Sequence, residues 1–159
     1  AEGMPWQMTH AEPIDIRQGP LTVSMTFSGA WDTRNIYIDG QPHPDLDDFD
    51  FTTVGHSIGK WEGDTLVADT VGFEGGVRVI PGGGLRTEKS RLVERYRLRR
   101  PNVLEVTFTW TDPDTLLKPH TYTWRFERAQ GTAWMTETAC DPVRNMRAKG
   151  LPLPFDAPQ

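Results

Sequence analysis

The segment 55–69 brings together residue types that can transfer protons. His56 lies in 55–59 (GHSIG), and Asp69 follows in the run 67–71 (VADTV). A glycine within a strand often marks a bulge or a close backbone approach, and a bulge can turn a side chain into a cavity. An imidazole gains or loses a proton near neutral pH. His56 is therefore a candidate catalytic acid or base with Asp69 as its partner, and the alternative is a structural histidine.

Charged residues interrupt the apolar alternation of several predicted strands. For example, Asp69 shares one face of its predicted strand with Val67, Val71 and Phe73, which are apolar. A charge on an apolar face needs a partner or a shifted pKa. Each case alone is more often a strand end or an internal salt bridge, but together they predict a polar network inside the fold. The residues concerned are Arg34, Asp69, Glu94 and Glu137.

The elements that must position these residues are β-strands. Apolar and polar residues alternate along 21–27, 103–111 and 120–128, which is typical of half-buried antiparallel strands. Turn residues at 63–64, 101–102 and 130–131 separate neighbouring strands. Weaker strands are predicted at 12–17, 31–39, 57–62, 64–73, 89–98 and 132–140.

The order of the strands predicts an all-β fold. Consecutive antiparallel strands favour an up-and-down barrel of about eight to ten strands, because closure removes exposed edges; a β-sandwich is the competing architecture. We expect one domain over 1–159, with a core at about 12–141 and a proline-rich tail at 142–159. The excursion 41–53 is expected to hold one helical turn, and the glycine-rich stretch 74–88 to form a mobile loop or a lid.

Composition excludes several function classes. The chain has 159 residues, and 17 Lys and Arg against 22 Asp and Glu give a net charge of −5, so nucleic acid is not an expected partner. No apolar run is long enough to span a membrane. The single Cys140 excludes an internal disulfide, and its own role stays open. The four histidines lack metal-ligand spacing and no nucleotide-binding motif occurs, so we expect neither metal nor cofactor.

The compartment and the oligomeric state stay open at this point. The chain begins at Ala1 and not at Met, as after removal of a signal peptide or trimming. A cytoplasmic, a periplasmic and a secreted protein are all compatible with one cysteine. A homodimer is compatible with the sequence as well.

Two blocks of the sequence resemble a family of bacterial lipocalin-like β-barrel proteins. The run 34–40 (RNIYIDG) with 42–44 (PHP) is similar to that family's RxIYLDGRxHP block. The run 55–70 (GHSIGKWEGDTLVADT) is similar to its GxSIGRWEGDTLVVDT signature. The resemblance covers about 13–141, including later landmarks at Glu94-Arg95-Tyr96, Asp112-Pro113 and the Glu137/Cys140 pair. The sequence departs from the pattern at 75–84 and at 118–120.

The resemblance implies a lipocalin-like (calycin-like) barrel and a small aromatic or hydrophobic ligand. We expect a cofactor-independent lyase, decarboxylase or isomerase, in which Arg34 holds an anionic group and His56 moves a proton. Asp69 or Glu94 would orient His56, and these side chains would meet inside the barrel. The alternatives are a carrier of a hydrophobic ligand that does no chemistry, and a structural domain. Expected substrate-binding residues, together with Trp31 as part of an aromatic wall, are Tyr37, Trp61, Trp110, Trp124 and Glu137.

Overall fold

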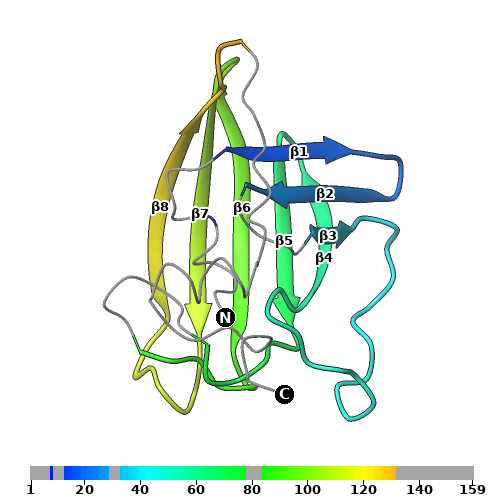
Figure 1. Cartoon of the computed structure of the whole chain (residues 1–159), viewed down its shortest axis with the longest axis vertical. Helices are drawn as coiled ribbons and strands as arrows, with labels where there is room; N and C mark the ends of the chain where they lie inside the picture. The colour runs from blue at the N-terminus through cyan, green and yellow to red at the C-terminus, as the bar shows by residue number, and fades with distance from the viewer. Residues whose placement is uncertain (1–7, 9–12, 29–32, 78–83, 132–159) are drawn as a thin grey trace, which may run out of the picture.

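The structure is an all-β sheet in which the strands follow one another in chain order. The computed structural model describes residues 8, 13–28, 33–77 and 84–131, and these contain no α-helix. One sheet has the order β1 to β8 (Figure 1). Its strands are β1 (Ile14–Gln18), β2 (Thr22–Phe27), β3 (Thr33–Tyr37), β4 (His56–Glu62), β5 (Thr65–Val71), β6 (Arg91–Arg100), β7 (Val103–Thr111) and β8 (His120–Glu127).

Neighbouring strands pair antiparallel at every position but one. β3 and β4 run parallel, with Ile36 opposite Ser57 and Tyr37 opposite Ile58. A parallel pair cannot be joined by a tight hairpin, so the chain between β3 and β4 has to return across the sheet. The long segment 38–55 makes this return, and it carries His43 and Phe49 over one face of β4 and β5.

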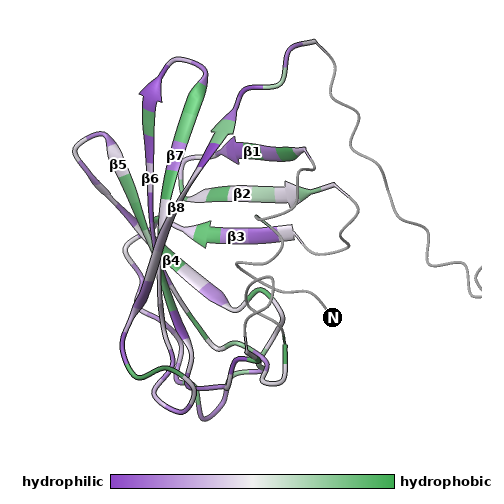
Figure 2. Cartoon of the chain, turned by 90° about the vertical axis from the view of Figure 1, so that its left-hand side faces the viewer, coloured by the Kyte–Doolittle hydropathy of each residue, from purple (hydrophilic) through white to green (hydrophobic). Residues whose placement is uncertain are grey.

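The sheet curls into a half-barrel, which confirms the predicted β-barrel class. β1 to β3 run across the direction of β5 to β8 in both views (Figures 1 and 2). Side chains on the concave face form the core, because alternate residues of each strand point to the same side. The core includes Met25, Ile36, Leu66, Leu92 and Phe108, all buried.

The predicted strands agree closely with the observed ones, and the connections agree less well. The predicted strand 132–140 and the tail 142–159 lie outside the described residues. The expected helical turn in 41–53 is absent, and a turn closed by a hydrogen bond from Asp48 N to Asp45 O at 3.4 Å stands there instead. Of the expected lid 74–88, the described ends pair with each other, because Arg86 N donates to Val77 O at 3.0 Å.

Two buried charges fix the loops at one end of the sheet. Arg86 is 1% exposed and donates to the carbonyl oxygens of Glu74 and Thr53, both at 2.8 Å. Asp112 is also buried and accepts hydrogen bonds from Ser90 Oγ at 2.6 Å and from the backbone of Thr87 at 2.7 Å. Charge-assisted bonds of this kind are stronger than neutral ones, so they hold the loops in one arrangement.

Candidate functional site

A buried arginine lies on the concave face with all of its hydrogen-bond capacity used. Arg34 is 1% exposed, and its five N–H donors reach hydroxyl or carboxylate oxygens of the protein. Nε donates to Ser57 at 3.0 Å, and Nη1 donates to Glu94 at 2.9 Å and to Tyr96 at 3.1 Å. Nη2 donates to Thr70 at 2.8 Å and to the second oxygen of Glu94. We call these five residues the buried arginine network.

The buried arginine network is electrically balanced. Burial alone would lower the pKa of Arg34, but the charges and hydrogen bonds of Glu94 and Tyr96 together outweigh it and raise that pKa above its ordinary value. Burial and the same carboxylate raise the pKa of the Tyr96 hydroxyl, which donates to Glu94 at 2.7 Å. Because every donor of Arg34 has a partner, the network has no free donor for an anionic ligand. Its geometry is that of an internal salt bridge that holds β3, β4, β5 and β6 together.

A second polar cluster lies on the opposite, outer face of the sheet. Nδ1 of His43 and Nδ1 of His56 are 3.0 Å apart, which is hydrogen-bond distance. Nε2 of His43 is 3.7 Å from Oδ2 of Asp69. Two imidazoles in such contact share a proton between their facing nitrogens, so the protonation of one ring governs the tautomer of the other.

Asp69 connects the histidines to an arginine on the next strand. Arg91 Nε donates to Oδ1 of Asp69 at 2.7 Å, and Nη2 contacts Oδ2 at 2.5 Å. The register explains the pair. Asp69 lies opposite Val93, so Arg91 is its diagonal neighbour on the same face.

Aromatic rings surround His56. Tyr37 stacks on it with ring centroids 5.3 Å apart, and Phe49 meets it edge-on at 5.8 Å. Gly72 lets Phe49 approach, because a Cβ at this position would lie 2.6 Å from the Phe49 ring. We call this outer-face cluster the histidine site; it consists of Tyr37, His43, Phe49, His56, Asp69 and Arg91.

The two histidines are predominantly neutral at pH 7. Burial lowers the pKa of His43, and the nearby charge of Asp69 offsets only part of this effect. Burial and the neighbouring His43 lower the pKa of His56, against the opposing charge of Asp39. A neutral imidazole keeps one nitrogen lone pair, and such a ring can accept a proton. The site is therefore suited to act as a base near neutral pH.

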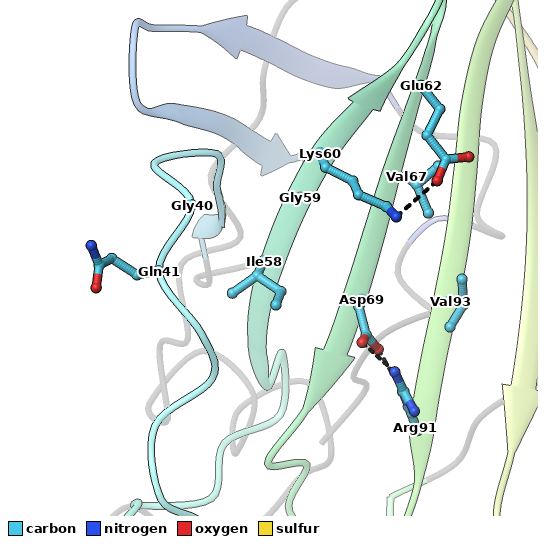
Figure 3. A pocket seen from close by; sticks show the side chains of 10 residues that line it. All are labelled: Gly40, Gln41, Ile58, Gly59, Lys60, Glu62, Val67, Asp69, Arg91 and Val93. Atoms are coloured by element: carbon cyan, nitrogen blue, oxygen red, sulfur yellow. Dashed lines mark hydrogen bonds and ion pairs between the residues drawn. The ribbon is translucent and has the colours of Figure 1, made fainter.

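A groove of about 500 Å³ lies beside the histidine site on the same face (Figure 3). Its floor is apolar and contains Ile58, Val67 and Val93. Asp69 and Arg91 point toward each other at one end, and Lys60 and Glu62 pair at 2.9 Å farther along. The volume lies within the range of small-molecule sites, which run from about 300 to 1,000 Å³. Asp69 belongs to both the groove and the histidine site, so a bound molecule would lie next to the imidazoles.

The structure separates the four predicted catalytic residues into two pairs. Arg34 and Glu94 meet inside, as the alternation predicts, whereas His56 and Asp69 lie on the outer face. The expectation that Arg34, His56 and Asp69 meet inside the barrel was therefore wrong. Both faces of β5 are apolar, and the buried face is the one with Leu66 and Ala68, so alternation alone could not place Asp69.

The predicted substrate-binding residues are scattered. Tyr37 joins the histidine site by stacking on His56. Trp110 is 3% exposed and packs against Phe73 in the core. Trp61 and Trp124 are 48% and 40% exposed at strand positions away from the histidine site. Glu137, like Cys140 and Trp31, lies outside the described residues.

Sequence reasoning missed three members of the histidine site: His43, Phe49 and Arg91. His43 stands in the 42–44 (PHP) block, so the two blocks that carry the family resemblance converge on one site in the fold. Arg91 could have been found only from the β5–β6 register. Phe49 lies in an irregular connection, where no periodicity places a side chain.

Comparisons with known proteins give no independent assignment. No protein-family model matches the chain, and neither the curated proteins nor the solved structures contain a significant match. Among the described residues no group of three or more His, Cys, Asp and Glu side chains is arranged to hold a metal ion. The same part of the chain contains no helix of the length and apolarity that a membrane span requires.

Proposed function

We propose that the protein is a cofactor-independent acid–base enzyme of the lyase, decarboxylase or isomerase type, acting on a small aromatic molecule at the histidine site. The observation that carries this proposal is the 3.0 Å contact between Nδ1 of His43 and Nδ1 of His56, beside the carboxylate of Asp69. A structural histidine needs no second imidazole in this position. The chain of Asp69, His43 and His56 is suited to store and release a proton.

The protonation pattern follows from the charges. The negative charge of Asp69 favours a proton on Nε2 of His43, so Nδ1 of His43 accepts from Nδ1–H of His56. Nε2 of His56 then carries the free lone pair and is the base. It removes a proton from the substrate, the positive charge spreads toward His43 and Asp69, and the proton returns to the product.

The surroundings support an aromatic substrate. Tyr37 and Phe49 flank His56, and Ile58, Val67 and Val93 make the groove floor apolar. An aromatic ring can pair with other aromatic rings and buries a large apolar area. The groove provides space for one ring with a short polar substituent.

A different observation favours the alternative of a ligand carrier without chemistry. On the concave face the Tyr122 hydroxyl is buried and has no hydrogen-bond partner among the residues that the structure describes, while Trp124 on the same strand face is 40% exposed. Burial and the charge of Glu94 raise the pKa of Tyr122, so this hydroxyl stays protonated. A hydrophobic molecule with one polar atom would satisfy it.

Turnover separates the two proposals. The protein is incubated with a panel of phenolic and aromatic acids, and products are followed by absorbance and mass spectrometry. We expect turnover, and we expect His56→Gln to lower it by about 10²–10⁴-fold, as removal of a general base does. The control is His120→Gln, an exposed histidine on β8 outside the histidine site. Saturable binding without turnover would favour the carrier.

A further inference from the structure

Two neighbours compete for the carboxylate of Asp69. Its Oδ2 contacts Nη2 of Arg91 at 2.5 Å and stands 3.7 Å from Nε2 of His43. The longer distance exceeds that of a hydrogen bond. That His43 nitrogen is buried and has no hydrogen-bond partner in the described part of the chain. A buried donor without an acceptor is costly, so a hydrogen bond from Nε2 of His43 to Asp69 would stabilise the site.

Arg91 is accessible from the groove. Its side chain is 57% exposed, whereas that of Asp69 is 22% exposed. Arg91 lines the groove next to Val93, and Figure 3 shows its guanidinium directed toward Asp69 at the end of the groove. A guanidinium binds a carboxylate through two parallel hydrogen bonds, and it does so with a ligand as well as with a side chain.

We propose that Arg91 binds a carboxylate group of the ligand, and that this carboxylate replaces Asp69, which then moves onto Nε2 of His43. The inference rests on the proposed function, since it names the substrate class of that site as small aromatic carboxylates. Asp69 is then a positioning residue. It exchanges one partner for another when the ligand arrives.

The exchange strengthens the protonation pattern that makes His56 the base. Once Asp69 accepts from Nε2–H of His43, Nδ1 of His43 accepts from Nδ1–H of His56, and Nε2 of His56 holds the free lone pair. The other charged groups facing this chain are few among the described residues. Asp39 acts on His56, and Lys60 and Glu62 pair with each other farther along the groove. None of these groups takes the place of Asp69 beside Nε2 of His43.

Nitrogen-15 NMR of the histidine side chains tests the exchange with benzoate as the probe. We expect benzoate to bind saturably and to raise the pKa of His43, because a carboxylate in direct contact stabilises the imidazolium. Arg91→Gln should weaken benzoate binding by at least about tenfold, the loss expected for a charge-assisted hydrogen bond. Asp69→Asn should bind benzoate at least as tightly while the pKa of His43 stays unchanged.

The control is Arg125→Gln, because Arg125 is also an outer-face arginine paired with a carboxylate, that of Glu105 at 2.9 Å. It should bind benzoate as the wild type does. The proposal is overturned if the NMR spectrum shows that Arg91→Gln is folded and the variant binds benzoate with unchanged affinity. It is also overturned if saturating benzoate leaves the pKa of His43 unchanged in the wild type. A rise in this pKa without turnover of any aromatic acid would instead contradict the enzymatic proposal alone.

Discussion

Replacing Glu94 by Gln tests whether the buried arginine network is structural. The substitution keeps the shape of the side chain and removes its negative charge. Glu94 is 0% exposed and accepts two hydrogen bonds from Arg34 and one from Tyr96. In Glu94→Gln an amide NH₂ replaces one acceptor oxygen, and the guanidinium of Arg34 remains buried without a counter-charge.

The expected loss of stability is large. Removing one partner of a buried ion pair costs about 3–5 kcal/mol, because the remaining charge is uncompensated. The free energy of unfolding of a native domain is about 5–15 kcal/mol, so the variant should lose a substantial part of its stability. Replacing both partners, as in Arg34→Met/Glu94→Leu, should cost less than the two single changes added together, since no charge stays buried.

Urea unfolding at pH 7, followed by circular dichroism and tryptophan fluorescence, measures these differences. Glu127→Gln, at the exposed end of β8, is the control, and its free energy of unfolding should lie within about 0.5 kcal/mol of that of the wild type. The reasoning would be refuted if the free energy of unfolding of Glu94→Gln lay within about 1 kcal/mol of that of the wild type. It would also fail if the losses of Arg34→Met and Glu94→Leu simply added in the double variant.

Two further predictions concern the backbone and the loops. Gly55→Ala should lower the free energy of unfolding in urea more than Gly63→Ala does. Both glycines have a positive φ, but of the two only Gly55 would bring a Cβ against a backbone oxygen, 2.7 Å away. Equal losses in the two variants would contradict this prediction. Burial raises the pKa of Asp112, yet hydrogen bonds from Ser90 and Thr87 outweigh it and lower that pKa to about 2. This folded-state pKa lies below the pKa of an unfolded aspartate. The free energy of unfolding that Asp112→Asn loses should therefore be constant above about pH 5 and shrink as the pH falls toward 2. A loss that does not depend on pH would contradict this prediction.

Strand alternation was sufficient to predict the sheet and the burial of two charges. Arg34 and Glu94 share their alternation with apolar residues, and both are fully buried. Alternation specifies the face of a side chain but not its partner. That they pair with each other depends on the curl of the sheet, because β3 and β6 are separated by β4 and β5 in the strand order and their side chains meet only over the concave face.

The histidine site was beyond strand alternation for two physical reasons. First, β5 has apolar residues on both faces, so hydrophobic burial does not determine the side on which Asp69 lies. Second, His43 and Phe49 lie in an irregular connection between parallel strands, and tertiary contacts decide where such a segment crosses. The family resemblance marked both 42–44 and 55–70, but only the fold shows that they meet.

The pH dependence of turnover on an aromatic acid, in the wild type and in His56→Gln, tests the central claim most directly. A neutral His56 is required as the base, so activity should be constant at neutral and mildly alkaline pH and fall as His56 becomes protonated. Because burial and His43 lower the pKa of His56 from its ordinary 6.5, the fall should lie below pH 6.5. The variant should lack this limb and most of the activity. A rate that increases as the pH falls, or an unchanged profile in His56→Gln, would contradict the assignment of the histidine site.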